Sequence, residues 1–573
     1  KTKSLKSRMP IPRLAFALVG IISLLLISGC KPKAEEEKVT EIAGYPVATD
    51  IKERLSQYAP TEITYDETLL NPEQKQVLEK LIQAARIIDG IFWKQASHVG
   101  LKVRKDFENA AHPAAEDYLR YMGINFGPFD RLDENKPFIG TQPKPLGAGF
   151  YPGDLTKKEF QDFVASHPEM KKDLESPYTV VKRSAEGLVA VPYSVEYRED
   201  LEAVARYLKE AAELTANIPL KTYLIQKAKD LLTNDCYKSD CLWIDLEGNL
   251  LEIVIGPYEV YEDNLLGLKA AYESFVYIND FDEMKKIRGY LDYLGEMQEK
   301  LPVEKKYKDQ EVVGLQSPLN VVIEVFTSGD TKAGVQTSAF VLPNDERIRE
   351  EKGTKKVFLK NMMEAKFQKS LVPISRRVLE EADAERVSFS AYFTQTILHE
   401  IAHALGVNYL TREDGTRITV NKALSDRYSA IEELKADIAG LYNVPLLIEK
   451  GWIPADRQEE IYTTYLAGMF RAIRFGAHEA HGLGTLIQLN FYREKGAFIY
   501  EAASGKFRVD HEKIRDSIAE LTRKILIIQG DGDYEAAGQL IETYGRMDAV
   551  IQDLLTKLKD IPVDIEPVFS FQK

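Results

Sequence analysis

Residues 388–406 read SFSAYFTQTILHEIAHALG, and this stretch decides how the rest of the chain is interpreted. Its apolar residues recur with the period of a buried helix, and Gly406 stands where a helix C-cap belongs. His399 and His403 are four residues apart, so both imidazoles project from one helix face and can hold one metal ion. Glu400 lies beside them and is a candidate to take a proton from a metal-bound water. The alternative for such a pair is two hydrogen-bonded histidines in the core.

A catalytic zinc site has three protein ligands and one open position, so the motif requires a third ligand. The segment YSAIEELKADIAGLY at 428–442 predicts a helix that carries Glu433 and Asp437 one turn apart. We assign Glu433 as the third ligand and Asp437 as the carboxylate that fixes the tautomer of one histidine. Glu432 points about 100° away and is a candidate for the same task at the other histidine. Taken alone, this charge run indicates only a solvated helix face.

Two neutral imidazoles and one carboxylate around a zinc ion leave a net charge of about +1. Such a site acidifies bound water and polarises a carbonyl oxygen, which is the chemistry of amide hydrolysis. Glu400 would pass the proton that it receives to the leaving amine. The residues therefore predict a zinc hydrolase with one metal ion per chain.

Elsewhere the chain predicts an α-rich protein with one small sheet or barrel in its middle third. Helical periodicity runs through 66–122, resumes at 157 and again over 194–232, and continues from 361 to about 558. Ser425 or Ser429 can cap the helix at 428–442. Gly and Pro are too frequent in 127–154 for regular structure. The β-rich runs are 187–193, 242–258, 320–326, 336–342 and 355–359.

The start of the chain indicates a targeting segment. Residues 1–13 carry five basic residues and no acid, and an apolar run over 14–27 is too short for a comfortable membrane span. Small residues then precede Cys30 in a pattern that resembles a bacterial lipoprotein signal, so we expect residues 1–29 to be removed and Cys30 to be lipidated. A plain secretory signal is the alternative. The charged residues that follow, up to about residue 50, read as a tether, and resemblance to other lipoproteins favours the periplasmic face of the outer membrane.

The charge balance excludes one class of partner. The 573-residue chain has 75 Lys and Arg against 89 Asp and Glu, a net charge of −14 that becomes about −19 without residues 1–29. Nucleic acid needs clustered basic residues, so an acidic body argues against it.

Two cysteines remain after Cys30. Cys236 and Cys241 are five residues apart in a stretch typical of a loop, and an oxidising compartment would allow a small disulfide between them. Two free thiols are the equal alternative. The spacing does not match the C-x-x-C form of a redox motif.

Several long motifs carry a family resemblance that covers most of the mature chain. They are DRLDENKPF at 130–138, GAGFYPGD at 147–154, IGPYEVYED at 255–263, LPNDERI at 342–348, the two helices described above, and HEAHGLG at 478–484. With these motifs the sequence resembles the zinc exopeptidases of the dipeptidyl peptidase III family, in the branch that includes plant relatives with a fused nudix domain. The printed sequence has no nudix signature, so the resemblance is to the peptidase part.

This resemblance implies roles for further residues. His481 would stabilise the transition state or hold the substrate, with His478 only as a neighbour, and Tyr261 would donate a hydrogen bond to the developing oxyanion. Glu259 and Asn344 would hold the free amino terminus of a short peptide substrate.

The family's fold would be α-rich α+β, with two lobes around a cleft. Residues 51–280 with 318–361 would form a lower lobe that contains a small β-barrel, and 281–317 with 362–573 a helical, zinc-binding upper lobe.

Two positions depart from the family pattern. The best-known members have H-E-x-x-G-H, whereas this chain has the shorter form, which still allows chelation. Val341 stands where an asparagine is expected, so one amide that would grip the substrate is lost.

Three functions therefore remain open. The first is a lipid-anchored zinc peptidase that releases dipeptides from the amino end of short peptides. The second is a zinc monoaminopeptidase or oligopeptidase with a different cut, which the loss at Val341 would favour. The third is a peptide-binding lipoprotein that keeps zinc without turnover, against which the intact Glu400 argues.

Overall fold

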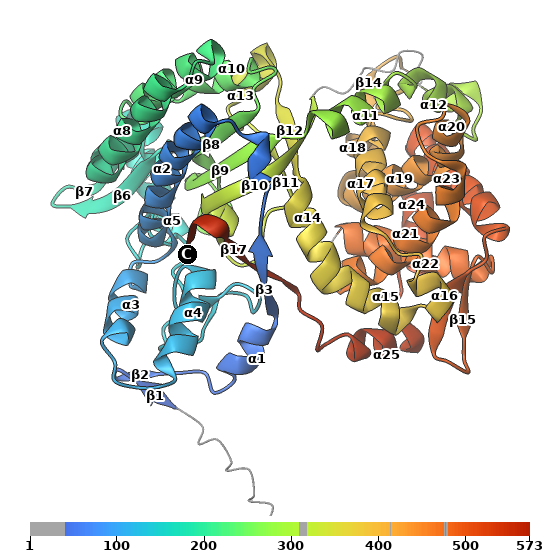
Figure 1. Ribbon diagram of the computed structural model, residues 1–573, viewed down its shortest axis with the longest axis horizontal. Coiled ribbons are helices and arrows are strands. Elements are labelled where there is room, and N and C mark those ends of the chain that lie inside the picture. The colour runs from blue at the N-terminus through green and yellow to red at the C-terminus, as the bar shows by residue number, and fades with distance from the viewer. Residues whose placement is uncertain (1–39, 309–317, 413, 475, 477–479, 573) are drawn as a thin grey trace, which may run out of the picture. The chain divides into compact units, whose positions relative to one another are not determined.

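The computed structural model describes residues 40–308, 318–412, 414–474, 476 and 480–572. The predicted signal segment, Cys30, residues 31–39 of the tether and His478 lie outside the described residues. The chain has a mostly helical α+β fold with two lobes, which confirms the predicted fold class (Figure 1). We call the part that contains the five-stranded sheet the sheet lobe, and the part that contains residues 281–301 and 360–561 the helical lobe.

The strands are β1 (Glu41–Ile42), β2 (Tyr45–Pro46), β3 (Tyr58–Ile63), β4 (Phe129–Asp130), β5 (Lys136–Pro137), β6 (Thr179–Ser184), β7 (Gly187–Pro192), β8 (Leu251–Glu259), β9 (Ala271–Asn279), β10 (Leu319–Gly329), β11 (Ala339–Leu342), β12 (Lys355–Leu359), β13 (Tyr409–Thr411), β14 (Arg417–Thr419), β15 (Phe498–Glu501), β16 (Lys506–Val509) and β17 (Asp564–Phe569).

The helices of the sheet lobe are α1 (Ile51–Ser56), α2 (Pro72–Ala96), α3 (Gly100–Glu108), α4 (Ala115–Asn125), α5 (Lys157–Ser166), α6 (Lys171–Leu174), α7 (Tyr193–Glu196), α8 (Arg198–Leu214), α9 (Ile218–Asp230), α10 (Tyr237–Ile244) and α13 (Glu346–Glu351). Those of the helical lobe are α11 (Phe281–Leu291), α12 (Leu294–Lys300), α14 (Lys360–Lys366), α15 (Val372–Val378), α16 (Glu381–Ala384), α17 (Phe389–Ala402), α18 (Val420–Leu424), α19 (Tyr428–Tyr442), α20 (Val444–Glu449), α21 (Gln458–Ile473), α22 (Ala480–Glu494), α23 (Lys513–Asp531), α24 (Tyr534–Tyr544) and α25 (Ala549–Lys557), with a π-helical turn, η5 (Phe367–Leu371), between α14 and α15.

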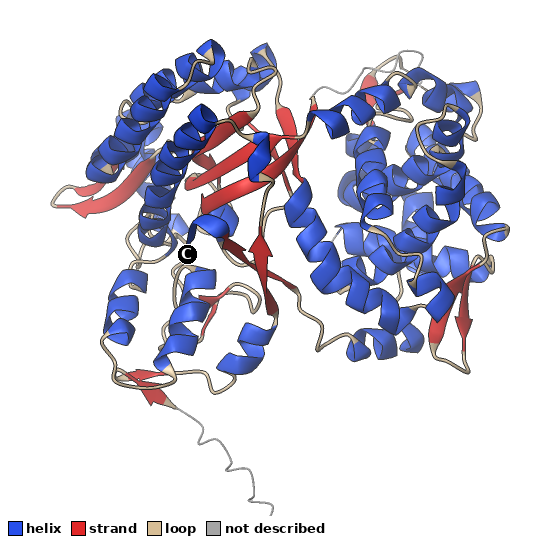
Figure 2. Ribbon diagram, viewed as in Figure 1, coloured by secondary structure: helices blue, strands red, loops and turns tan. Residues whose placement is uncertain are grey.

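The main sheet has the strand order β11-β12-β10-β9-β8, in which β10 and β12 are parallel and the other neighbours antiparallel. It is an open, curled half-barrel rather than a closed barrel, because β11 and β8 remain at its two edges. All nine residues of β9 are buried, and α2 packs against β9 and β10. Figure 2 shows these strands gathered in one lobe and the helices that follow in the other.

The helical lobe is built around one continuous apolar core. Leu398 and Ile401 of α17 pack in it with Leu434 and Ile438 of α19 and with Leu486 of α22. Helix α19 contacts α17, α22 and α23, so it lies at the centre of this lobe. The core therefore fixes α17 and α19, the two helices that carry the predicted metal ligands, against each other.

Several sequence-based boundaries differ from the structure. The tether was expected to reach residue 50, but 40–50 fold into the β1–β2 hairpin and the turn after it, because Ile42 and Val47 are buried. Strand β17 pairs in parallel with β3 of the sheet lobe, so the helical lobe does not extend to residue 573.

Two local predictions also change. Cys236 and Cys241 are free thiols, so the disulfide alternative is not formed. No serine side chain caps α19: Ser425, with a φ of 51°, begins a 3-10 turn that leads directly into the helix.

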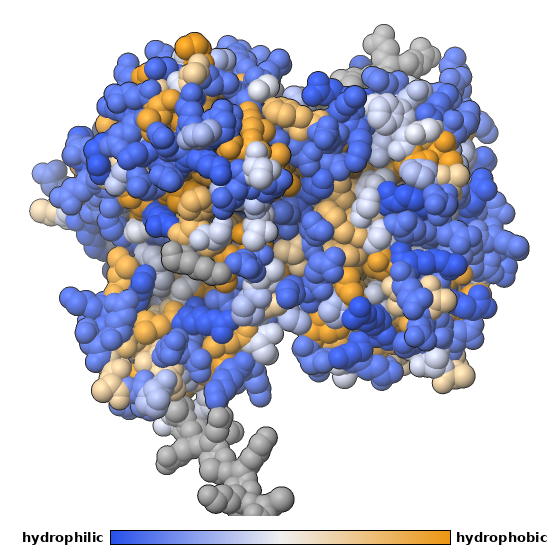
Figure 3. Space-filling view, in the orientation of Figure 1, coloured by the Kyte–Doolittle hydropathy of each residue, from blue (hydrophilic) through white to orange (hydrophobic). Residues whose placement is uncertain are grey.

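Among the described residues, no helix combines the length and the apolar character that a bilayer crossing requires. On the face drawn in Figure 3, hydrophilic residues cover most of the surface and apolar residues form small patches.

Candidate metal centre

Helix α17 presents the H-E-x-x-H motif at its C-terminal end. Its N-cap is Ser388, whose side chain accepts a hydrogen bond from the Ala391 amide at 3.1 Å. The helix ends at Ala402, earlier than predicted, and His403 is its C-cap. His403 keeps right-handed helical angles (φ −58°, ψ −29°), so its imidazole still lies on the same face as that of His399.

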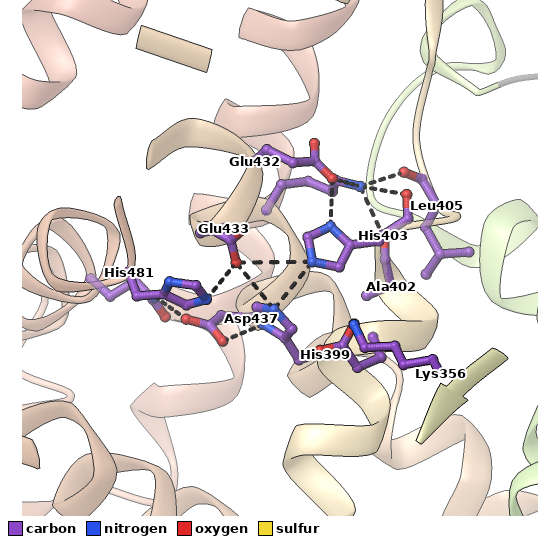
Figure 4. A network of polar contacts seen from close by, with 12 residues as sticks. Lys356, His399, Ala402, His403, Leu405, Glu432, Glu433, Asp437 and His481 are labelled. Atoms are coloured by element: carbon purple, nitrogen blue, oxygen red, sulfur yellow. Dashed lines mark hydrogen bonds and ion pairs between the residues drawn. The ribbon is translucent and has the colours of Figure 1, made fainter. Parts of the chain in front are cut away.

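His399, His403 and Glu433 form a group that can hold a metal ion, and we call this group the metal cluster (Figure 4). The Nε2 atoms of His399 and His403 are 3.2 Å apart, and Glu433 Oε2 lies 3.2 Å from the first and 3.9 Å from the second. Ligands about 2.0–2.1 Å from a tetrahedral zinc ion are about 3.3 Å apart, so these separations fit one shared ion. Glu433 Oε2 is buried and faces the Nε2 atoms of His399, His403 and His481, where it can also reach a shared metal ion.

A carboxylate from α19 holds each imidazole of the metal cluster. His399 Nδ1 lies 2.7 Å from Asp437 Oδ1, and His403 Nδ1 lies 2.8 Å from Glu432 Oε1. A proton on Nδ1 donates to the carboxylate and leaves Nε2 with its lone pair toward the common point. The structure thus places Asp437 and Glu432 where the sequence analysis expected them.

Further polar residues support these two carboxylates. Gln488 Nε2 donates to Asp437 Oδ2 at 3.0 Å, and the Tyr465 hydroxyl donates to Gln488 Oε1. Gln529 Nε2 donates to Glu432 Oε2 at 2.8 Å. All three side chains come from other helices of the core, so nothing in the local motifs could identify them.

Lys435 lies in the charged run of α19, and the sequence analysis assigned it no role. Its side chain is only 3% exposed, and Nζ donates to the carbonyl oxygens of Ala402, His403 and Leu405 at 3.0–3.1 Å. It also pairs with Glu432 at 2.8 Å. Lys435 therefore caps the C-terminal end of α17 and fixes His403 there. Its position three residues after Glu432 was the one available signal.

The electrostatics of the cluster favour positive charge at its centre. Burial lowers the pKa of His399, but the carboxylates of Asp437, Glu433 and Glu400 outweigh burial and raise it to about 10. Burial likewise opposes ionisation of Glu433, yet hydrogen bonds from His399 and His481 hold its pKa well below the usual range. A divalent cation satisfies the same carboxylates that otherwise retain protons on the imidazoles. The donor set and its charges therefore fit a zinc ion.

Glu400 and His481 also lie at the cluster. The Glu400 carboxylate forms an ion pair with Lys356 Nζ, which reaches it from β12 of the sheet lobe (Figure 4). His481 Nε2, on α22, lies 2.9 Å from Glu433 Oε2, and its ring is roughly parallel to that of His399. The structure therefore brings both predicted residues to the metal cluster, together with an unpredicted lysine.

The remaining predicted residues form a second group at one end of the main sheet. Asn344 Nδ2 donates to Glu259 Oε1 at 3.2 Å and to the Tyr258 carbonyl oxygen at 3.0 Å. Tyr261 lies two residues after the end of β8 and is 78% exposed. Burial raises the pKa of Glu259, with the Asn344 amide opposing. Within the described part of the chain, no hydrogen bond or ion pair joins this group to the metal cluster.

Val341 lies on β11, an edge strand of the sheet, directly opposite Lys356 of β12. Its apolar side chain is exposed. The position expected to carry an amide is thus at the sheet edge, beside the strand that reaches Glu400.

Comparison with known proteins agrees with this site. The family model "Peptidase family M49" matches residues 154–442. A curated relative, Nudix hydrolase 3 of Arabidopsis thaliana, is 35% identical over 91% of this chain and 74% of its own length. Dipeptidyl peptidase 3 of Nematostella vectensis is 24% identical over 54% of this chain and 48% of its own.

Solved structures are similar as well. Dipeptidyl peptidase III of Caldithrix abyssi superposes with a TM-score of 0.87 at 46% identity, covering 91% of this chain and 99% of the other. The enzyme from Corallococcus sp. strain EGB gives a TM-score of 0.73 at 40% identity, covering 92% and 98%.

Together, the fold and the two helices with the histidine and glutamate ligands define a metallopeptidase. The chain belongs to peptidase family M49 and is an enzyme of the dipeptidyl peptidase III type, as the sequence motifs predicted.

Proposed function

We propose that the protein is a zinc-dependent dipeptidyl peptidase that releases dipeptides from the free amino end of short peptides. The observation that carries this proposal is the convergence of His399, His403 and Glu433 at 3.2–3.9 Å, with Glu400 beside them. Zinc bound there supplies Lewis acidity toward the peptide carbonyl and lowers the pKa of a coordinated water.

The other residues of the site then have separate roles in the reaction. Glu400 accepts a proton from the attacking water and delivers it to the leaving amine. Asp437 and Glu432 keep the two imidazoles in the ligating tautomer. His481 and Tyr261 donate hydrogen bonds to the oxygen that gains charge, and Tyr261 does so from the sheet lobe.

The second group sets the length of the product. Glu259 and Asn344 already share a hydrogen bond, and a carboxylate with an amide oxygen suits a substrate ammonium. When a peptide is held there by its amino terminus, the same peptide bond, counted from that end, always lies beside Glu400. Because Val341 contributes no amide, a monoaminopeptidase or oligopeptidase cut is the second candidate.

The test is product analysis with metal-replete protein and a mixture of free and amino-acetylated tetra- to octapeptides. Mass spectrometry is expected to detect dipeptides as the first products of the free peptides and no cleavage of the acetylated ones. Single amino acids or internal fragments would replace the proposal with the second candidate, and intact peptides throughout would mean that the protein binds peptides without cleaving them.

Glu400→Gln serves as the companion variant. We expect it to keep one zinc ion per chain and to lose about 10²–10⁴-fold in kcat, the usual contribution of a general base. Glu385→Gln, an exposed residue after α16, is the matched control and should retain full activity. Near-normal turnover in Glu400→Gln would remove Glu400 from the base role.

We also propose that Cys30 is lipidated and anchors the enzyme at the periplasmic face of the outer membrane. The support is the basic and apolar pattern of residues 1–29. Mass analysis of the protein from membranes should give a diacylated or triacylated N-terminal peptide, and Cys30→Ala should release the enzyme into the soluble fraction. An unmodified Cys30 would contradict the anchor.

A further inference from the structure

The turn that carries Tyr261 is held by buried groups that have no role in the proposed mechanism. The Asp263 amide donates to the Val260 carbonyl oxygen at 3.1 Å, which closes a β-turn directly after β8. Tyr261 and Glu262 are the two central residues of this turn. Tyr261 is 78% exposed, whereas Glu262 is 2% exposed. The exposed tyrosine is therefore joined directly to a residue that is anchored inside the sheet lobe.

Glu262 lies between two cations from an earlier part of the chain. Its Oε2 is 2.8 Å from Arg131 Nη1, and its Oε1 forms an ion pair with Lys144 Nζ. The Lys144 side chain is only 9% exposed, and Arg131 is itself fixed because its amide and its Nε donate to Asn125. Burial opposes ionisation of Glu262, but Arg131 and Lys144 outweigh burial and lower its pKa. Glu262 is thus a buried, ionised group whose partners hold it in one place.

Asp263 fixes the other side of the turn. It is 3% exposed, and its carboxylate accepts a hydrogen bond from the Tyr151 hydroxyl at 2.9 Å. The same carboxylate accepts at 2.8–3.1 Å from four backbone amides, which are those of Leu265, Leu266, Leu268 and Lys269. Hydrogen bonds to a carboxylate are among the strong ones, so these five hold the backbone of 263–269 in one conformation.

The side chain of Tyr261 has no comparable support of its own. Among the described residues, none shares a hydrogen bond with the Tyr261 hydroxyl. The charge of Glu259, and then burial, raise the pKa of this hydroxyl, so it keeps the proton that it would donate. The position of the phenol is therefore set by the backbone of the turn, and the turn is set by Glu262 and Asp263.

The partners of the two acids come from motifs to which the mechanism gives no role. Arg131 and Tyr151 lie in the motifs DRLDENKPF and GAGFYPGD, and Lys144 stands between these motifs. The two acids end the motif IGPYEVYED, which also contains Tyr261. Segments more than a hundred residues apart in sequence thus converge on the turn that presents one phenol.

We propose that Glu262 and Asp263 are positioning residues, which hold Tyr261 where its hydroxyl meets the oxyanion of the transition state. This role depends on the proposed function, in which Tyr261 donates that hydrogen bond. The two cations and the tyrosine that bind these acids act through them. Misplacing a group of the site by about 1 Å can cost about 10²-fold in rate, so the acids affect turnover without touching the substrate.

Lys144→Met and Tyr151→Phe test the two anchors, because each removes one polar contact and nearly keeps the size of the side chain. We would measure both with metal-replete protein and a free tetrapeptide that wild type cleaves. We expect kcat to fall about tenfold or more in Lys144→Met and less in Tyr151→Phe, while KM changes by less than about twofold. Lys80→Met is the matched control: it removes an ion pair with Glu210 in the same lobe, between α2 and α8, and should keep the wild-type kcat.

A double-mutant cycle separates positioning from a general loss of structure. Tyr261→Phe lacks the hydroxyl, so in this background Lys144→Met and Tyr151→Phe should cause little further loss of kcat. Equal losses with and without the hydroxyl would overturn the proposal, because the anchors would not act through Tyr261. A wild-type kcat in Tyr261→Phe would overturn it as well, whereas release of dipeptides by wild type would still support the peptidase function.

A second measurement does not depend on activity. With 4-fluorophenylalanine in place of Tyr261, a single fluorine NMR signal reports the surroundings and the mobility of this ring. We expect Lys144→Met and Tyr151→Phe to shift or broaden the signal, and Lys80→Met to leave it as it is. A signal that stays the same in Lys144→Met and Tyr151→Phe would overturn the proposal even if wild type cleaved no peptide.

Discussion

At the level of single residues, the metal cluster depends on carboxylates that never touch the metal. Asp437 is the clearest case, because it accepts from His399 Nδ1 and is itself held by Gln488. A ligand histidine fixed in this way is more basic and needs no reorientation when zinc arrives.

Asp437→Asn isolates the charge of that carboxylate, since the amide oxygen can still accept from Nδ1. We expect zinc affinity to fall about 10–100-fold, the usual cost of altering such a partner. Competition titration against a chelator measures this, with exposed Asp516→Asn of α23 as the control. Unchanged zinc affinity would mean that the Asp437 carboxylate does not support zinc binding by His399.

The residues of the cluster could be predicted because their spacing has chemical meaning. His399, His403 and Glu433 lie in two helical motifs, and Asp437 and Glu432 follow from the helical period. The sequence could not predict the roles of Lys356, Gln488 and Gln529. Each lies on an element far from the motif in sequence, and its contact with the site exists only after folding. Lys435 could not be assigned a role from the sequence, because a charged run alone indicates a solvated face and its carbonyl partners are known only after folding.

At the level of elements, the site depends on how closely α17 and α19 approach. Gly440 of α19 lies against the α17 backbone: a Cβ added there would be 3.0 Å from the Leu398 carbonyl oxygen and 3.2 Å from the His399 amide. Glycine lets the two helices pack at a distance that brings Glu433 to both histidines.

Gly440→Ala should therefore move α19 away from α17. We expect lower thermal stability and weaker zinc binding, because backbone atoms cannot yield as a flexible side chain can. Gly468→Ala is the matched control: it lies inside α21 with nothing within 4 Å of the added Cβ, and should stabilise by about 0.5–1 kcal/mol through helix propensity. Equal effects of the two substitutions on zinc affinity would contradict this account.

The sequence predicted the long helices better than the strands. Helices with a long apolar period, such as α2 and α8, lie within the predicted helical regions. Strand β9 was missed because Glu273 and Ser274 interrupt its apolar run, although both are buried. Residues 242–244 were expected to be β-structure but end α10, since a short apolar run does not distinguish helix from strand.

At the level of the whole molecule, the two lobes meet through chain crossings, polar contacts and apolar packing, such as that of Phe358 on β12 against Phe393 on α17. Lys356 joins β12 to α17 through Glu400, and β17 returns the chain to the sheet lobe. Asn361, where β12 leads into α14, holds the backbone of Glu324 on β10: it accepts from the Glu324 amide at 2.9 Å and donates to the Glu324 carbonyl oxygen at 2.8 Å. The Glu324 side chain is buried at this junction, so its ionisation bears on the stability of the fold as a whole.

Burial raises the pKa of Glu324 from 4.5 to about 8, with Thr327 and Lys366 opposing only in part. Between these two values the folded protein holds a proton on Glu324 that the unfolded chain releases, so the contribution of Glu324 to wild-type stability falls as the pH rises from about 4.5 to 8. Glu324→Gln keeps the shape of the neutral acid and removes this dependence. We expect its melting temperature to match that of the wild type near pH 4.5 and to exceed it increasingly up to pH 8.5. There the difference in the free energy of unfolding reaches several kcal/mol, since each pKa unit is worth about 1.4 kcal/mol. Calorimetric scans of both proteins at each pH measure the difference, and the other titrating groups cancel in the comparison.

Exposed Glu364→Gln on α14 is the control, and its stability should differ from that of the wild type by nearly zero throughout. A Glu324→Gln difference that stays constant from pH 4.5 to 8.5 would show that the buried carboxyl does not titrate in this range.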